Sequence, residues 1–491
     1  MSFRLASIAF LSIAAVAAAG CGSKKVAKKA APMPTPPYRH FVSRPDLKPP
    51  MIKIDTPARG TAPGLIFIAP KMVVAQAGPE IVDNAGNVVW FHPLGIKGVA
   101  DFKVQRYRGK PVLTWWRGRA PKGVGSGYYA IYDTSYRQIA QVRAGHGLTG
   151  DIHEFLITPN DTALFTIYQQ KHVDLSKVGG PKEGRIFDGI VQEVDIPTGR
   201  VLFEWHSYPE VDLNESYVPA PKPNKGAKAP PWDYIHINSI DPEPNGNLLI
   251  SGRNTRALYE ISRTGKILWR LGGKRTDFKL GPGAQFAWQH DARWHGNSTI
   301  TLFDNGAEPP VEKFTRVLVL HVDTAHKRVT LMRTYVHPKH LLVPFEGNAQ
   351  ILPDGHVFVG WGALPYYSEF SADGHVLLDA YFGHGKPVLK DADSYRAFRF
   401  VWHGQPGDPP TLVIRGNTAY VSWNGATDVG SWRLLAGEAN DDLAAKRTVP
   451  KAGFETAIPL PPNGRLTRFV AVEAMARNGR MIGTSATLER H

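Results

Sequence analysis

Cysteine is almost absent from this chain of 491 residues, in which Cys21 is the only one. A disulfide needs two cysteines, so no such bond can form within the chain. The stability of the folded protein must therefore come from the packing of its secondary structure.

The chain also lacks a Lys/Arg-rich run after residue 40 and any nucleic-acid-binding signature. Its formal net charge of +15 is consistent with three partner classes: nucleic acid, an anionic membrane surface or a small anionic substrate. The N-terminus predicts secretion, which argues against the first, so we expect no nucleic acid partner. Scattered positive charge would help to attract a small anion.

Residues 5–19 form an apolar run that follows Arg4. The run is shorter than the ~20 residues of a membrane-spanning helix but has the length of a signal-peptide core. Ala18-Ala19-Gly20-Cys21 follows and resembles a bacterial lipobox, in which the cysteine is lipidated and becomes the mature N-terminus. We therefore expect residues 1–20 to be a lipoprotein-type signal peptide. An ordinary secretory signal with a chance cysteine is the alternative.

The lipid on Cys21 would anchor the protein to the bacterial cell membrane on its extracytoplasmic side, in the periplasm or at the cell surface. Residues 21–40 are then a flexible basic tether. Lysines among Ala and Pro dominate this stretch, and it has too few large apolar side chains to form a core.

The chain is rich in turn-forming residues, with 48 Gly and 40 Pro. We therefore expect an all-β fold without long helices. One hairpin pattern recurs, with an apolar strand, a turn of Gly, Asp or Asn, and a second strand. Its copies are residues 80–90, 130–140, 191–205, 258–269, 317–329 and 366–377.

A second hairpin type lies between these copies, at residues 153–170, 236–254, 290–305 and 348–362. Two hairpins per period make a four-stranded sheet, and about six such sheets indicate a six-bladed β-propeller. We place this catalytic domain at residues 41–403. A multidomain protein rich in β-sandwiches is the alternative, and it fits the even alternation less well.

The repeat of hairpins ends after residue 403, and Pro406, Pro409 and Pro410 follow. Short alternating strands at 419–424, 432–435 and 469–474 are typical of fibronectin or immunoglobulin domains. We expect residues 404–491 to form a small C-terminal β-sandwich.

The second hairpin type begins with a polar residue at equivalent positions, namely His153, His236, His290 and Asn348. In a propeller the first strand of each blade lines the channel, so three of these blades would direct a histidine into one funnel. Arg253 ends a partner strand and offers a charged fork for sulfonyl or phosphoryl oxygens. Asn238 lies two residues beyond His236 and should project from the same strand face.

Metal binding is the alternative interpretation of this cluster, because three histidines with Glu154 and Asp291 could hold a divalent ion. A metal-dependent hydrolase or lyase would then be expected. Arg253 would lie unfavourably close to such a cation, and we predict no metal site.

Long phrases of the chain resemble the bacterial arylsulfotransferase family. They are residues 188–206, 232–240, 250–254, 267–273, 286–293 and 302–306. The similarity extends from about residue 43 to residue 427, most of the mature chain.

The resemblance implies a six-bladed propeller that transfers sulfate from a phenolic sulfate ester to a phenol acceptor in two steps. It needs no cofactor and no nucleotide sulfate donor. By motif, His290 corresponds to the transiently sulfated histidine, His153 and His236 to its supporting histidines, and Asn238 and Arg253 to the sulfate-binding residues. Which of His153 and His236 acts as acid and base stays open. The cysteine pair of the better-known secreted members is missing here.

The chemistry of these side chains is compatible with that activity, because a neutral imidazole is a competent nucleophile near physiological pH. A lipid-anchored propeller that only binds a ligand is the alternative that involves no catalysis.

Overall fold

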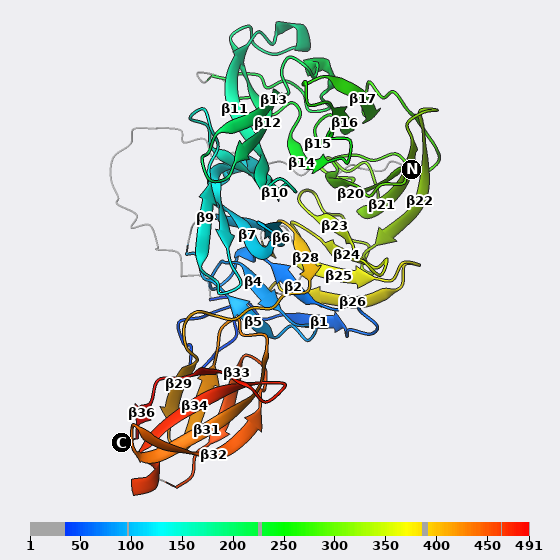
Figure 1. The fold of residues 1–491 in the computed structure, drawn as a ribbon. Helices are drawn as coiled ribbons and strands as arrows, with labels where there is room; N and C mark the ends of the chain where they lie inside the picture. Colours follow the sequence, from blue (N-terminus) through cyan, green and yellow to red (C-terminus); the bar gives the residue numbers. More distant parts are fainter. Residues whose placement is uncertain (1–34, 96–97, 224–227, 385–390, 463, 491) are drawn as a thin grey trace, which may run out of the picture. The chain divides into compact units, whose positions relative to one another are not determined.

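The computed structural model describes residues 35–490, apart from 96–97, 224–227, 385–390 and 463 (Figure 1). The expected signal peptide (1–20), the expected lipidation site Cys21 and most of the expected tether (21–40) lie outside these residues. At the end of that tether, Tyr38 forms an antiparallel bridge with Pro50. No helix in the described part of the chain is both long enough and apolar enough to span a membrane.

The fold is all-β, as the turn-rich composition predicts, and helical geometry in the described residues is limited to single 3-10 turns. These turns are η1 (Pro121–Gly123), η2 (Ser176–Val178), η3 (Leu213–Glu215) and η4 (Arg465–Thr467).

The hairpins predicted from the sequence form antiparallel sheets. The first contains β2 (Leu65–Ile68), β4 (Glu80–Val82), β5 (Val88–Phe91) and β28 (Ala397–Phe400). The next comprises β6 (Gly98–Tyr107), β7 (Lys110–Arg119), β8 (Ser126–Tyr132) and β9 (Gln138–Val142), followed by β10 (Gly150–Ile157), β11 (Thr162–Val173), β12 (Gly184–Asp195) and β13 (Val201–His206). A single pairing between Gly150 of β10 and Gly127 of β8 joins these two groups of four strands into one continuous sheet.

Three further sheets follow the same plan. One holds β14 (Ile237–Pro242), β15 (Leu248–Gly252), β16 (Ala257–Ile261) and β17 (Ile267–Gly272); the next holds β19 (His290–Trp294), β20 (Thr299–Asp304), β21 (Arg316–Asp323) and β22 (Arg328–Val336), with β18 (Lys279–Leu280) beside β22. The last holds β23 (Asn348–Ile351), β24 (Val357–Gly360), β25 (Tyr366–Phe370) and β26 (Val376–Tyr381), with β1 (Lys53–Thr56) beside β26.

The inner strands of these sheets contact one another in a closed order, β6 to β10, β14, β19, β23, β28 and back to β6. Figure 1 shows the labelled inner strands facing a common centre. Two pairings close the ring between distant parts of the sequence: β28 lies against β2, and β1 against β26. β3 (Lys71–Met72), which follows β2, pairs in the same way with β27 (Ala392–Asp393), which precedes β28.

After residue 403 the chain forms two separate sheets. One consists of β29 (Thr411–Arg415), β30 (Thr418–Ser422) and β33 (Glu455–Pro459). The other consists of β31 (Val429–Ala439), β32 (Asp442–Pro450), β34 (Phe469–Ala476), β35 (Met481–Thr484) and β36 (Leu488–Glu489). The division at residues 403 and 404 stays a prediction.

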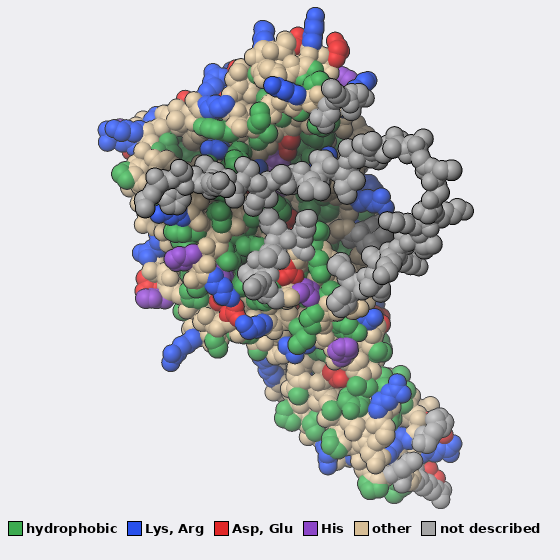
Figure 2. All heavy atoms as spheres, turned by 180° about the vertical axis from the view of Figure 1, so that it is seen from behind, with side chains coloured by type: hydrophobic (Ala, Val, Ile, Leu, Met, Phe, Trp, Pro, Cys, Tyr) green, Lys and Arg blue, Asp and Glu red, His purple; other side chains and the backbone are tan. Residues whose placement is uncertain are grey.

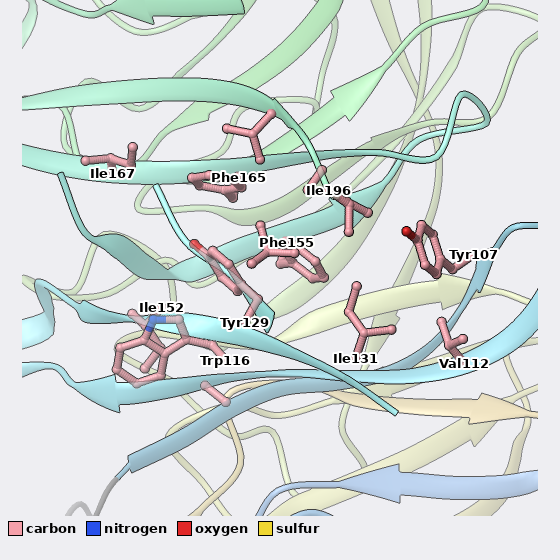
Figure 3. Close-up of a cluster of buried hydrophobic side chains, with 14 of the residues drawn as sticks. Tyr107, Val112, Trp116, Tyr129, Ile131, Ile152, Phe155, Phe165, Ile167 and Ile196 are labelled. Atoms are coloured by element: carbon pink, nitrogen blue, oxygen red, sulfur yellow. The ribbon is translucent and has the colours of Figure 1, made fainter. Parts of the chain in front are cut away.

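Apolar cores fill the spaces between neighbouring sheets. Figure 3 shows one of them, where Tyr129 of β8 stacks on Phe155 of β10 with ring centroids 4.4 Å apart, and Trp116 and Phe165 pack around this pair. Such interdigitated aromatic side chains bury large apolar areas and hold adjacent sheets at a defined angle.

The centre of the ring is charged rather than apolar. Buried ion pairs join Asp101 and Lys103 of β6, Glu154 of β10, Asp291 and Arg293 of β19, and Arg396 just before β28. The Arg396 guanidinium contacts Glu154 at 3.0 Å, Asp291 at 3.4 Å and the backbone carbonyl of Asn238 at 3.1 Å. One side chain thus connects β10, β14 and β19.

Removal of Arg396 should therefore destabilise the fold strongly. Arg396→Met leaves three buried carboxylates with two cations, and breaking a buried pair typically costs about 3–5 kcal/mol. We expect that loss in the free energy of unfolding measured with urea. The control Arg468→Met removes an exposed arginine 2.6 Å from the exposed Glu489 and should cost less than about 1 kcal/mol. A loss as small as that of the control would contradict the structural role of Arg396.

Candidate functional site

Three histidines from three sheets lie next to one another at one end of the channel. His153 is in β10, His236 directly precedes β14, and His290 begins β19. Ring centroids are 4.6 Å apart for His153 and His236, and 6.4 Å for His236 and His290. The structure thus brings the three histidines predicted from the sequence into one cluster.

In each of these rings the Nδ1 atom is already bonded, but the partners differ. His153 Nδ1 bonds to Asp151, and His236 Nδ1 lies 2.5 Å from Asp233 Oδ2. His290 Nδ1 instead lies 2.7 Å from Asn305 Oδ1. Two imidazoles are therefore backed by a carboxylate, and the third by a neutral amide. In all three, Nε2 is the ring nitrogen that these side chains leave unbound.

The tautomer of His290 follows from the contacts of Asn305. The Asn305 Nδ2 atom donates to the carbonyls of Val343 and Glu346, both at 3.0 Å, so Oδ1 faces the ring. An amide oxygen only accepts, so His290 Nδ1 carries the proton and Nε2 carries the lone pair. The backbone N–H of Glu346 donates to this lone pair at 3.2 Å.

Electrostatics keep His290 neutral. Burial, followed by the charge of Arg253 and the neighbouring His236, lowers the pKa of His290 well below 6.5. Burial also lowers the pKa of His236, although Asp233 opposes the shift. Asp233 itself has a lowered pKa, because the charge and hydrogen bond of His236 outweigh the effect of burial.

The backbone around the cluster is bent into an unusual conformation. His236, Trp288, Asp291 and Glu346 have φ angles of 54°, 60°, 53° and 65°, in the left-handed region that few residues other than glycine adopt. Such conformations concentrate at functional sites, where surrounding contacts hold them in place.

Arg253 follows β15 and lies beside the histidines. Its backbone N–H donates to the His236 carbonyl at 2.9 Å, and its guanidinium donates to the Pro344 carbonyl and to Asn254 Oδ1, each at 3.0 Å. Burial lowers the pKa of Arg253 to about 10. The Nε atom is buried and has no hydrogen-bond partner among the described residues, so the protein leaves this donor unsatisfied.

Asn238 is fully buried below the cluster. Its Nδ2 atom donates at 2.7 Å to the carbonyl of Gln289, the residue before His290. Its Oδ1 atom has no partner in the described part of the chain. The contact seen in the structure thus positions the backbone that carries His290.

Sequence reasoning missed the residues behind the histidines. Asp151 and Asp233 precede His153 and His236 by two and three positions, and this Asp-to-His spacing was the available signal. Glu346 gave no signal, because it lies in an irregular loop. Its carboxylate is 3.1 Å from Lys71 Nζ, and burial raises its pKa to about 7 against the effect of that lysine.

The carboxylates considered for a metal ion are engaged elsewhere. Glu154 and Asp291 belong to the ion network around Arg396. Within the described ranges, no group of three or more His, Cys, Asp or Glu side chains is arranged to hold a metal ion.

Comparison with known proteins gives one family. A family model described as arylsulfotransferase (ASST) matches residues 103–383. No curated protein sequence matches the chain.

Among solved structures, the chain is similar to a protein of unknown function from Bacteroides caccae, with TM-score 0.41, 12% identity and coverage of 68% of this chain and 98% of the other. It is also similar to virginiamycin B lyase from Staphylococcus aureus, with TM-score 0.33, 8% identity and coverage of 75% and 95%.

The neutral state of His290 predicts a pH dependence of stability. Below pH 6.5 an unfolded histidine binds a proton that the folded His290 does not, so stability falls as the pH decreases. One such histidine contributes at most about 1.4 kcal/mol per pH unit. His290→Gln keeps a donor for Asn305 and should make the fall shallower by up to that amount.

The measurement is the free energy of unfolding in urea between about pH 7 and about pH 5. His326→Gln, at an exposed histidine, serves as the control and should keep the wild-type slope. An unchanged slope in His290→Gln would show that His290 is protonated in the folded protein.

Proposed function

Since this chain belongs to the arylsulfotransferase family, we propose that it transfers a sulfuryl group from a phenolic sulfate ester to a phenol acceptor, with His290 as the nucleophile of a ping-pong reaction on a six-bladed propeller. The observation that carries the proposal is the difference between the amide behind His290 and the carboxylates behind His153 and His236.

The first half-reaction forms a sulfohistidine. The lone pair of His290 Nε2 attacks the sulfur, and the bond between sulfur and the phenolic oxygen breaks. The leaving oxygen takes a proton from His153 or His236. The products are the free phenol and a sulfuryl group bonded to Nε2.

The second half-reaction reverses these events with a new phenol. The histidine that lost its proton removes one from the acceptor hydroxyl, and the acceptor oxygen attacks the sulfur. The N–S bond then breaks, and the electron pair returns to Nε2. Atoms and charge balance without a cofactor.

The side chain bonded to Nδ1 of each histidine suits the proposed role of that histidine. A neutral amide does not stabilise the imidazolium form, so His290 keeps the lone pair that a nucleophile needs. A carboxylate stabilises the positive charge that arises when His153 or His236 takes up a proton. The two carboxylate-backed rings are therefore suited to acid and base catalysis.

Three donors surround the position of the sulfuryl group. Arg253 supplies a positive charge and an unpartnered Nε–H. The Glu346 N–H lies 3.2 Å from the attacking nitrogen and can donate to a sulfuryl oxygen once the N–S bond exists. We assign Asn238 to the same site, since one hydrogen of its amide group remains beside that used by Gln289.

We further propose that Cys21 carries a lipid anchor, so that the enzyme acts on the extracytoplasmic side of the bacterial cell membrane, and that residues 404–491 form a separate β-sandwich. The lipobox-like sequence before Cys21 and the two additional sheets after residue 403 support these proposals.

Loss of the nucleophile should abolish transfer. We expect purified protein to release nitrophenolate from 4-nitrophenyl sulfate in the presence of a phenol, and His290→Ala to reduce this rate by at least about a thousandfold. His326→Ala, at an exposed histidine, should keep the wild-type rate. Brief exposure to donor without acceptor should add the mass of one sulfuryl group to the peptide that contains His290. Acceptor-independent release, or release that survives His290→Ala, would contradict the assignment. Absence of any transfer would favour a protein that only binds its ligand.

The acid catalyst should be recognisable from its dependence on the leaving group. Asp151→Asn and Asp233→Asn each remove the carboxylate behind one histidine. The variant that weakens the acid should lose about 10²-fold with phenyl sulfate, whose leaving group needs a proton, and much less with 4-nitrophenyl sulfate. The measurement is kcat/KM for a series of donors. Equal losses for all donors in both variants would contradict acid catalysis by either histidine.

A further inference from the structure

A stack of alternating cations and aromatic rings extends from the histidine cluster toward the protein surface. The guanidinium carbon of Arg253 lies 5.1 Å from the ring centroid of Trp288, and that of Arg256 lies 4.1 Å from the same ring. Arg256 also lies 4.1 Å from the ring of Tyr217, and Lys274 Nζ lies 5.0 Å from that ring. Tyr217 is 38% exposed, so the outer end of the stack reaches solvent.

One tight turn positions both arginines. β15 ends at Gly252 and β16 begins at Ala257, and the backbone N–H of Arg256 donates to the carbonyl of Arg253 at 3.1 Å. This bond closes the turn and keeps the two arginines close together in the backbone. Both guanidinium groups contact the Trp288 ring. Trp288 is itself held by a hydrogen bond from its indole N–H to the Pro309 carbonyl at 3.0 Å.

Neither guanidinium has an ion-pair partner. Among the residues that the structure describes, no carboxylate lies within 4.0 Å of Arg253 or Arg256. The Nε atoms of both are buried without a hydrogen-bond partner. By contrast, Arg293 and Arg396 in the channel each lie within 4.0 Å of three carboxylates.

Two unpaired cations this close together are unfavourable in isolation. Burial disfavours the charged form of each and lowers the pKa of both Arg253 and Arg256. The charge of Arg256 adds to the lowering for Arg253, whereas Asp233 and Glu308 oppose it at longer range. The face of Trp288 offsets only part of this cost. An anion at each guanidinium would satisfy both charges. Under the proposed function, the sulfate ester provides the anion for Arg253.

We propose that Arg256 forms a second anion subsite, so that the enzyme selects aromatic sulfate esters and phenols that carry a further anionic group, a carboxylate or a second sulfate, on the ring. This inference depends on the proposed function. The aromatic ring between the two anionic groups would pack against Phe345, which is 39% exposed and adjoins Pro344, whose carbonyl binds Arg253.

A pair of donors that differ in one charge tests the subsite. 4-Sulfooxybenzoate carries a carboxylate opposite the sulfate ester, and its methyl ester has nearly the same shape without that charge. A hydrogen bond between charged groups is worth about 1.5 kcal/mol or more, which corresponds to a preference of about tenfold in kcat/KM. We expect this preference in the wild-type protein, and we expect it to weaken as salt is added. Benzene-1,4-disulfate replaces the carboxylate by a second sulfate and shows which of the two anions is preferred.

Arg256→Gln should reduce the ratio of the two kcat/KM values to about one, and Arg256→Lys should keep part of it. Arg143→Gln is a matched control, because Arg143 also lies over an aromatic ring, at 5.0 Å from Tyr128, but on another sheet. It should keep the wild-type ratio. A wild-type ratio of one, or an unchanged ratio in Arg256→Gln, would overturn the proposal.

Binding measurements separate this proposal from the proposed function. Calorimetric titration with 4-hydroxybenzoate and with its methyl ester reports the charge preference without turnover, in the wild type and in both Arg256 variants. Failure of every phenyl sulfate as a donor would refute the transferase activity, whereas equal affinities for the two phenols would refute the second subsite. A circular dichroism spectrum matching the wild type confirms that each variant is folded, and Arg256→Lys remains informative if Arg256→Gln does not fold.

Discussion

The buried contacts of Arg396 are the constraint on which the site depends. Its guanidinium binds Glu154 and Asp291, and it also binds the carbonyl of Asn238. Glu154 and Asp291 are the chain neighbours of His153 and His290, so any displacement of the ion network would move the histidines as well. The charged centre is thus the common support of three strands that belong to different sheets, and the distances between the imidazoles follow from it. A purely apolar centre would fill the same space without defining these positions so closely.

The local structure was accessible from the sequence because each hairpin is a contiguous segment. Residues 258–269, for example, became β16 and β17, and residues 290–305 became β19 and β20. The equivalent positions of the three histidines, each in or next to the first strand of its sheet, also followed from this repeat. The closing pairings of β28 with β2 and of β1 with β26 join segments more than 300 residues apart, and such pairings leave no periodic signal. The contacts of Glu346 escaped prediction for a related reason, since its loop has a φ of 65° and no regular pattern.

The chemistry of the cluster comes from the partners of three identical side chains. His153, His236 and His290 have the same ring and the same bonded nitrogen, yet the group behind each ring differs in charge. An amide and a carboxylate occupy nearly the same volume, so the fold could assign different protonation behaviour to each histidine without changing its packing. At Trp288, likewise, one ring contacts two guanidinium groups that have no carboxylate of the described residues within 4.0 Å.

The closure of the ring by β28 has a consequence for biosynthesis. β2 lies between β28 and β4, and β28 lies some 330 residues later in the chain, at Ala397–Phe400. A growing chain therefore exposes one edge of β2 until almost the whole ring has left the ribosome. Unpaired strand edges of this kind invite pairing with other chains. The nascent protein thus needs protection for most of its synthesis, and its ring can close only in the final stage.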